Sequence, residues 1–272
     1  MMKNSFLSYL AVFCFIWIPY RIMAQDANEL KVPEGTSWFL LGDDSEEGNI
    51  QCIALNYNGL VYYACNNAIG CLGDAKQIEM PSRFRVRSMC WTNDNNLILY
   101  SNDTLYVLNE ELSLHPLLSV TASKLVLQPI GEKDFAFCVA NDTVLYRYFT
   151  KSDSLTVVTS LDNPIRDFVV DDEDYYIAYG NRVVVFSQEK RLFPILMDEE
   201  PITNLAFCGS QSFLFSTPTS LWCVNDKREK ELLINQPIID MMSDDYDRAF
   251  FMLQDGTWIF LYPISTYETG QE

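Results

Sequence analysis

Short apolar runs recur along the chain, separated by polar turns at a nearly constant interval. The register is clearest in a run that opens at Thr104, Thr143, Arg182, Ser220 and Thr257, at intervals of 37 to 39 residues. Each repeat reads as an apolar run, an acidic or Asn/Gly-rich turn, a second apolar run, a tight turn and an aromatic-rich run. The pattern shows no helical period. It predicts a repeat protein that is built from β-strands.

Two sets of predicted strands align between the repeats. The first strands lie at 50–55, 86–91, 123–127, 165–170, 202–207 and 238–243, and the second strands at 60–65, 97–102, 135–140, 175–180, 212–217 and 249–254. Many of them are apolar at every position, which indicates burial on both faces. A β-propeller explains this pattern, because each blade packs between two others. The two-residue turns Asn102-Asp103, Asn141-Asp142, Gly180-Asn181 and Asp255-Gly256 support it, since these residue types tolerate positive φ.

The number of repeats predicts the number of blades. The last repeat ends near Tyr262 without a fourth strand, whereas 36–41 reads as a strand without a repeat. We therefore predict an all-β fold, a six-bladed β-propeller of four-stranded blades whose last blade is completed by the N-terminal strand. Such closure leaves no open sheet edge. Seven blades, the first of them degenerate, are the alternative.

The N-terminus has the pattern of a secretory signal peptide. Lys3 gives a positive start, 6–18 is apolar, and Ala24 is the small residue before the expected cleavage site. We expect a signal peptide at 1–24, a single propeller domain at 25–272, and a secreted or periplasmic location. The apolar run is short for a membrane span, so none is expected in the mature chain. An uncleaved N-terminal anchor is the alternative.

The chain is strongly acidic, with 19 basic and 37 acidic residues and a formal charge of −18. Cleavage after residue 24 would remove Lys3 and Arg21 and no acid, which leaves a charge of −20. Such a surface repels polyanions, so we exclude nucleic acid and anionic lipid as partners. It is compatible with a solvated surface, or with cationic or calcium-bridged partners.

Cysteine and histidine usage predicts no metal site and no cofactor. Seven cysteines follow residue 24, most of them in apolar strands where a thiol behaves as a small buried apolar group. Cys65 and Cys71 flank a predicted turn, and either pair as a disulfide or remain thiols. The single histidine, His115, is placed in a loop, and no C-x-x-C occurs, so zinc is not expected. The acidic clusters 43–47 and 171–174 lack EF-hand spacing and are interpreted as solvated turns.

The repeats resemble a family of six-bladed propellers. These are bacterial propellers of the NHL-like and periplasmic sensor type, whose blades carry a D-x-x-G-x-aliphatic-aromatic signature. Residues 56–62 (NYNGLVY) match it, residues 244–250 (DDYDRAF) match it poorly, and the other repeats lack the glycine. The resemblance covers nearly the whole mature chain and implies the fold only, because the families that share it include binding modules, lyases and hydrolases.

One position in each first strand supplies the candidate site. The third position of each strand is polar in five of the six repeats, and equivalent positions in a ring lie at the same height around the axis. We therefore expect these side chains to surround one opening of the channel as a ligand-binding site, with two arginines at its rim. The alternative is that they bond the backbone of the innermost strands and line a water-filled channel. The predicted site residues are Ser88, Lys124, Asp167, Asn204 and Asp240, with Arg87 and Arg166 at the rim.

The function that follows is that of a binding module. We predict a monomeric secreted or periplasmic propeller of the bacterial cell envelope that recognises a protein or glycan partner at the channel mouth. No catalytic residue is predicted, because the chain has neither a nucleophile elbow nor a P-loop. A polysaccharide hydrolase or lyase using Asp167 and Asp240 is one alternative, and a structural subunit of a cell-envelope assembly is another. Trp38, Trp91, Trp222 and Trp258 lie on predicted strands and are interpreted as packing between blades.

Overall fold

The computed structural model describes most of the chain after residue 36. The described residues are 37–40, 50–56, 59–65, 67–72, 74–109, 111–130, 134–139, 141–171, 173–187, 189–208, 212–243, 249–253 and 258–262. All of them belong to one compact unit, Gly35–Glu272. The predicted signal peptide at 1–24 and the predicted turn at 255–256 lie outside the described residues.

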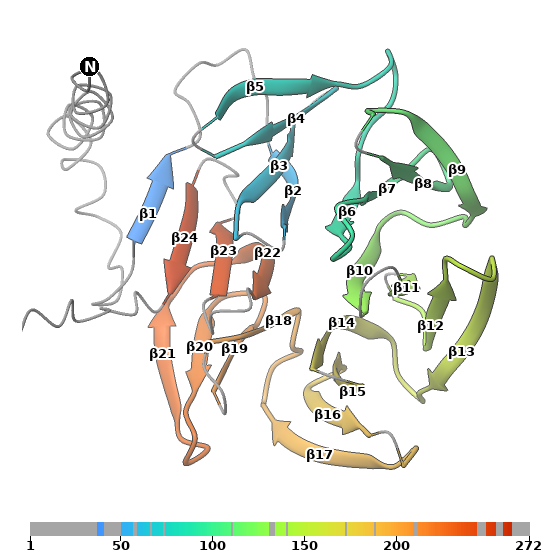
Figure 1. Ribbon diagram of the computed structural model, residues 1–272. Helices are drawn as coiled ribbons and strands as arrows, with labels where there is room; N and C mark the ends of the chain where they lie inside the picture. Colours follow the sequence, from blue (N-terminus) through green and yellow to red (C-terminus); the bar gives the residue numbers. More distant parts are fainter. Residues whose placement is uncertain are drawn as a thin grey trace, which may run out of the picture. The chain divides into compact units, whose positions relative to one another are not determined.

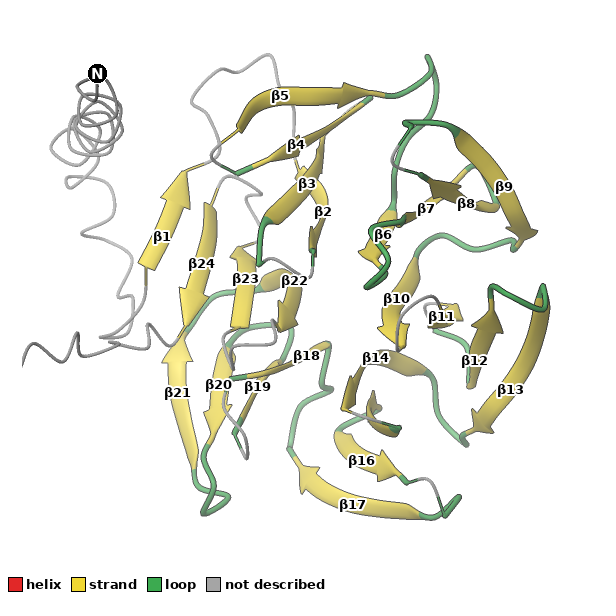
Figure 2. Ribbon diagram, in the orientation of Figure 1, coloured by secondary structure: helices red, strands yellow, loops and turns green. Residues whose placement is uncertain are grey.

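The described residues form antiparallel four-stranded sheets (Figures 1 and 2). In five of them the four strands follow one another along the chain. The first two sheets contain β2 (Ile50–Leu55), β3 (Val61–Cys65), β4 (Ala68–Cys71) and β5 (Asp74–Glu79), then β6 (Ser88–Trp91), β7 (Leu97–Ser101), β8 (Thr104–Leu108) and β9 (Leu114–Ser119). The next contains β10 (Leu125–Ile130), β11 (Asp134–Val139), β12 (Val144–Phe149) and β13 (Ser154–Ser160). Two more contain β14 (Ile165–Asp171), β15 (Asp174–Tyr179), β16 (Arg182–Phe186) and β17 (Leu192–Met197), then β18 (Asn204–Phe207), β19 (Phe213–Ser216), β20 (Leu221–Val224) and β21 (Lys230–Ile234).

The sixth sheet joins the two ends of the described chain. It contains β22 (Ile238–Ser243), β23 (Ala249–Leu253), β24 (Trp258–Tyr262) and β1 (Ser37–Leu40). β1 pairs antiparallel with β24, so that Ser37 lies opposite Leu261 and Leu40 lies opposite Trp258. This is the position that the sequence pattern gave to the N-terminal strand.

The first strands of the sheets contact one another in a cycle. Contacts join β2 to β6, β6 to β10, β10 to β14, β14 to β18, β18 to β22, and β22 back to β2. The second, third and fourth strands follow outward in each sheet (Figure 1). This is the arrangement of an all-β propeller, as predicted.

The core lies between neighbouring sheets. Every residue of β7 is buried, and Ile98 and Tyr100 pack in one cluster with Leu125, Phe135 and Phe137 of the next sheet. Burial on both faces explains why the second strands are apolar without alternation, which the sequence pattern had indicated. The turn Asn102-Asp103 has positive φ at both residues, as a two-residue hairpin turn requires.

The fourth strands differ from the sequence-based expectation. His115 lies in strand β9 opposite Val107, and not in a loop. Pro116 follows it in the same strand, and a proline is tolerated in a strand at the edge of a sheet, where its missing N–H faces outward. Pro194 occupies the corresponding edge strand β17.

Candidate functional site

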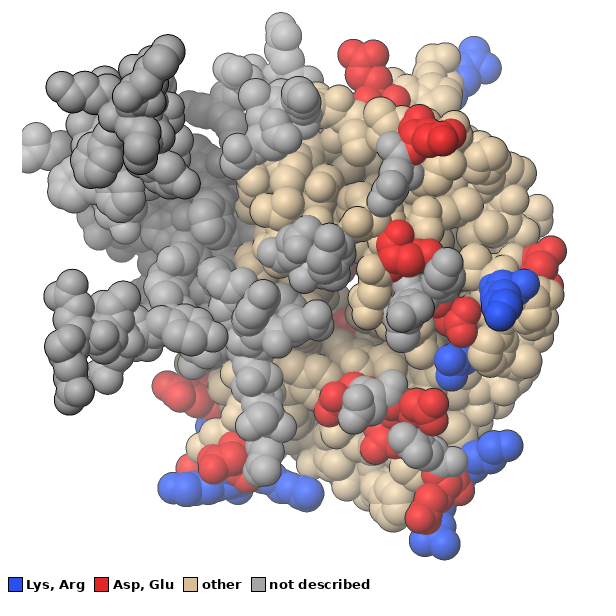
Figure 3. Space-filling view, viewed as in Figure 1, with Lys and Arg blue, Asp and Glu red and all other residues tan. Residues whose placement is uncertain are grey.

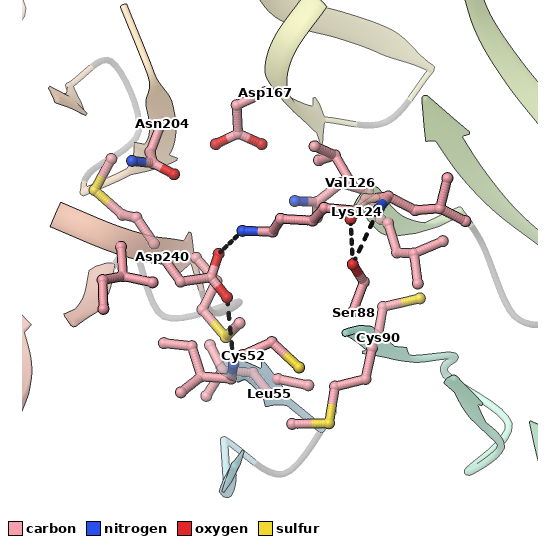
Figure 4. A pocket seen from close by; sticks show the side chains of 18 of the residues that line it. Cys52, Leu55, Ser88, Cys90, Lys124, Val126, Asp167, Asn204 and Asp240 are labelled. Atoms are coloured by element: carbon pink, nitrogen blue, oxygen red, sulfur yellow. Dashed lines mark hydrogen bonds and ion pairs between the residues drawn. The ribbon is translucent and has the colours of Figure 1, made fainter. Parts of the chain in front are cut away.

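A cavity of about 330 Å³ lies where the first strands meet, at the centre of the ring. Residues from the first strands of all six sheets line it (Figure 4). Six of the seven predicted site residues line this cavity, and Arg87 is the one that does not. The six are Ser88, Lys124, Arg166, Asp167, Asn204 and Asp240.

An ion pair crosses the cavity. Lys124 Nζ lies 3.8 Å from Asp240 Oδ1, and its side chain is 38% exposed against 19% for the aspartate. The nearby Asp240 carboxylate raises the pKa of the Lys124 ammonium, against the opposing effect of burial. Lys124 immediately precedes β10 and Asp240 lies in β22, so the pair joins opposite members of the ring (Figure 4). The ammonium is therefore charged and points into the channel.

Asp167 is buried, with 6% of its surface exposed. Its two carboxyl oxygens accept hydrogen bonds from the backbone N–H groups of Phe168, at 2.8 Å, and Leu205, at 2.6 Å. Burial is the main cause that raises the pKa of this carboxyl to about 8, and the charge of Asp240 acts in the same direction, whereas the two backbone hydrogen bonds and Lys124 oppose the shift. Both carboxyl oxygens of Asp167 therefore accept hydrogen bonds from the protein's own backbone.

Equivalent site residues bond equivalent backbone groups in the next sheet. Ser88 Oγ accepts from the Leu125 N–H at 3.2 Å and also donates to the Leu125 carbonyl. Asp167 accepts from the N–H of Leu205, and Asp240 from that of Ile53, at 3.3 Å. In each case a polar side chain of one first strand accepts a hydrogen bond from a backbone N–H group of the following first strand.

Asn204 joins the same scheme through its side-chain amide. The Nδ2 group donates to the Ile238 carbonyl of β22 at 3.3 Å and to Ser216 Oγ at 2.8 Å. The polar ring therefore ties neighbouring sheets together around the channel. This is the backbone-bonding role that the sequence left open as the alternative to ligand binding.

The two predicted rim arginines both reach toward the sheet of β10. Arg87 comes from the preceding sheet and donates to the carbonyls of Ala122 and Ser123, at 3.4 Å each. Arg166 comes from the following sheet and donates to Asn141 Oδ1. Both guanidinium groups are exposed. Arg87 thus contacts the residues just before Lys124, and Arg166 contacts the turn between β11 and β12 of the same sheet.

Sequence reasoning missed apolar and aromatic residues that also line the cavity. Trp91, at the end of β6, is one of them, and its ring lies 4.8 Å from that of Tyr62. Its indole Nε1 is buried without a hydrogen-bond partner among the described residues. The sequence assigned Trp91 to packing between blades because it lies on a strand, and its contact with Tyr62 of the neighbouring sheet agrees with this; a position on a strand does not reveal that the ring also lines the cavity.

Charge is unevenly distributed on the face drawn in Figure 3. Acidic side chains stand around the middle of this face, and most basic ones lie toward its margin. Among the described residues, no group of three or more His, Cys, Asp or Glu side chains is placed to hold a metal ion. The described residues also contain no helix that is long and apolar enough to cross a membrane.

Comparisons with known proteins support the fold. No protein family and no curated protein matches the sequence. Among solved structures, a streptogramin B lyase is similar over 81% of each chain, with a TM-score of 0.63 and 10% identity. A catalytically inactive virginiamycin B lyase from Staphylococcus aureus in complex with quinupristin matches over 83% of this chain and 98% of its own, with a TM-score of 0.60 and 8% identity. An auxiliary nutrient binding protein from Bacteroides thetaiotaomicron matches over 79% and 68%, with a TM-score of 0.57 and 12% identity. At these identities the shared property is the β-propeller fold.

Proposed function

We propose that this chain is an exported six-bladed propeller that acts as a binding module and recognises a protein or glycan partner at the mouth of its central channel. The observation that carries the proposal is the cavity of about 330 Å³ into which polar side chains of several sheets converge. A concave site with a few convergent polar groups on an apolar lining is the usual form of a ligand site. The signal-peptide pattern at 1–24 supports export. A nutrient binding protein among the structural neighbours supports a binding role.

The hydrogen bonds divide the polar ring into two roles. Ser88 and Asp167 have their oxygens committed to the next sheet, so they position the site. Lys124 has one ion pair at 3.8 Å and retains donor capacity toward the channel. We assign the ligand contacts to Lys124 and Asp240, together with Arg166 and Asn204, and the positioning role to Ser88, Asp167 and Arg87.

The test uses the binding of native partners. The full chain and its Lys124→Met variant would be compared on a glycan array and in a pull-down from a cell envelope. Loss of a charged hydrogen bond is worth about 1.5–3 kcal/mol, so we expect binding to fall roughly tenfold or more. Lys151→Met, at an exposed turn, is the matched control and should bind normally. Equal binding by the Lys124 variant would contradict a site at the channel.

The exposed surface of β17 supports a second candidate function, that of a structural subunit in a cell-envelope assembly. Strand β17 forms the outer edge of its sheet and exposes three large apolar side chains: Leu192 at 44%, Phe193 at 47% and Met197 at 64%. Exposed apolar surface of this kind is typical of a protein interface. Light scattering of the full chain and of a Phe193→Asp variant tests this role. A larger species that Phe193→Asp dissociates would support assembly and would contradict the expected monomer.

The hydrolase or lyase alternative depends on Asp167. A carboxyl with a raised pKa in a cavity is the property of a general acid. Both oxygens of Asp167 are engaged by backbone N–H groups, however, and the single histidine of the chain lies in the outer strand β9. Release of reducing ends or unsaturated products from polysaccharides, abolished by Asp167→Asn, would favour this alternative over the binding module.

A further inference from the structure

Strand β13 (Ser154–Ser160) forms the outer edge of its sheet, in which the strands follow the order β10-β11-β12-β13 (Figure 1). Its inner side pairs with β12, and among the described residues no strand pairs with its outer side. It spans seven residues, and no described strand is longer. The backbone N–H and C=O groups along such an outer side are able to pair with a further strand.

The sequence of β13 lacks the features that protect other outer strands. Proline, charged side chains and short length keep an edge strand from pairing with another chain. β9 contains Pro116, β17 contains Pro194, β5 and β21 contain charged residues such as Glu79 and Lys230, and β1 has four residues. β13 reads SLTVVTS, without a proline or a charge, in a chain of formal charge −18. Among the described outer strands it is therefore the one best suited to pairing.

Three consecutive residues of β13 are exposed. Leu155 is 42% exposed and Val157 is 61% exposed, and Thr156 between them is exposed as well. Pairing with β12 is regular over this segment, with Leu155 opposite Tyr148 and Val157 opposite Tyr146. Side chains two positions apart on a strand point to the same face of the sheet. Leu155 and Val157 therefore form an exposed apolar pair on one face, directly at the open edge.

This segment is complementary to a second copy of itself. If two copies of β13 pair antiparallel about a two-fold axis at Thr156, Leu155 of each copy lies opposite Val157 of the other. Apolar side chains that face each other across two strands stabilise the pair, and the two-fold axis repeats the contact. No like charges lie opposite each other within the paired strands, because β13 has none.

The charges at the two ends of β13 are complementary in the same arrangement. Lys151 precedes the strand, Asp162 follows it, and both are exposed. Antiparallel pairing brings the beginning of one strand to the end of the other, so that Lys151 of each copy approaches Asp162 of its counterpart. Asp153, which lies close to Lys151 in the chain, is engaged within its own sheet by the Tyr148 hydroxyl, which donates to its Oδ1.

We propose that this chain forms a symmetric homodimer in which β13 of one copy pairs antiparallel with β13 of the other. The sheet of β10 to β13 then continues into the same sheet of the second copy. A single strand pair is at the small end of specific interfaces, which bury about 1,200–2,000 Å², so the dimer is weak and reversible. The proposal departs from the monomer predicted from the sequence, and it is independent of the channel site. Two linked channel sites would increase the avidity for a multivalent partner.

The first test is sedimentation velocity of the full chain over a range of concentrations, from about 1 μM to about 1 mM. The salt concentration is about 0.15 M, at which charges more than about 8 Å apart are largely screened, so that the acidic surfaces repel each other little. We expect a reversible equilibrium between monomer and dimer. A chain that stays monomeric throughout, or that forms trimers or larger species instead, would overturn the proposal.

The second test places a charge in the proposed interface. Val157→Lys should raise the dissociation constant by about tenfold or more, because pairing would bury an ammonium group opposite Leu155. The added positive charge lowers the net negative charge, so greater repulsion between the copies cannot explain the loss. Phe193→Lys makes the same change in charge at a residue of β17 that is 47% exposed, and it should leave the dimer intact. A dimer that only Phe193→Lys dissociates would assign the interface to β17 and would contradict the pairing of β13.

The third test examines the register and does not depend on the fold of the Val157 variant. Thr156 lies opposite its own counterpart, and opposed residues on paired strands have Cα atoms about 4.5–5.5 Å apart, within the range that a disulfide bridges. Thr156→Cys should therefore form a covalent dimer with oxidised glutathione. Ser160→Cys changes an exposed residue of the same strand that lies far from its counterpart, and it should remain as uncrosslinked as the wild-type chain. Equal cross-linking of the two variants would rule out the proposed register.

Discussion

Lys124 and Asp240 reach each other across the central channel from opposite sheets, with 3.8 Å between Nζ and Oδ1. Asp240 also accepts a hydrogen bond from the Ile53 N–H of the neighbouring sheet. One carboxylate thus connects three of the sheets: its own, the next, and the one on the far side. The channel is consequently polar at its centre, although most of the surrounding strands are apolar.

The first prediction concerns the contribution of the ion pair to stability. Lys124 is more than one third exposed, so solvent screens the pair, and we expect Lys124→Met to change the free energy of unfolding by less than about 1 kcal/mol. Urea denaturation measures this, and a double-mutant cycle with Asp240→Asn isolates the coupling. A loss of several kcal/mol would show that Lys124 is structural and would weaken its assignment to ligand binding.

The second prediction concerns the contribution of Asp167 to stability. A side chain at the mouth of a channel carries little packing, but Asp167 is buried and binds two backbone N–H groups. Asp167→Ala leaves both donors without their acceptor and should lower the free energy of unfolding by about 2–4 kcal/mol. Asp162→Ala, at an exposed site in the preceding turn, is the control and should have little effect. Equal stability of the two variants would show that these hydrogen bonds contribute nothing.

The third prediction follows from the raised pKa of Asp167. Its folded-state pKa of about 8 lies above the unfolded value near 3.9, so the folded protein binds the proton more tightly. The stability contribution is fully present below about pH 4 and is lost as pH rises through about 8. Wild-type stability, measured by denaturation between pH 5 and 9, should therefore fall more steeply with pH than that of Asp167→Asn. Parallel curves would mean that Asp167 is already ionised at pH 5.

The fourth prediction concerns the N-terminal strand. β1 pairs with β24, so deletion of residues 26–42 exposes the edge of the last sheet. We expect aggregation or a clear loss of thermal stability. Deletion of 26–36 alone keeps β1 and serves as the control. A monomeric 26–42 deletion with unchanged Tm would show that the strand does not contribute to the fold.

The strands that are buried between sheets could be predicted from the sequence, whereas the strands at the outer edge of each sheet were harder to predict. Strands such as β7 are buried on both faces, which leaves continuous apolar runs that recur with the repeat. Fourth strands such as β9 and β17 are largely exposed and contain Pro116 and Pro194, so burial does not shape their sequences, and His115 was misplaced.

The position of the site could be predicted from the sequence, but the hydrogen bonds and the ion pair of its residues could not. Equivalence between repeats is enough to bring Asp167, Asn204 and Asp240 to one channel. The bonds that they make depend on the next sheet, however, and the pairing of Lys124 with Asp240 depends on closure of the whole ring. Neither can be deduced from spacing, because both are set by the packing of strands that are far apart in sequence.

The pairing of β1 with β24 also constrains the order in which the sheets can form. β1 is synthesised before its partner β24, which follows more than 200 residues later in the chain. The two strands can therefore pair only after β24 has been made. Earlier sheets can form as local hairpins while the chain emerges, but the ring stays open until its C-terminal strand is available. Closure of the ring is therefore expected to be the last step of folding.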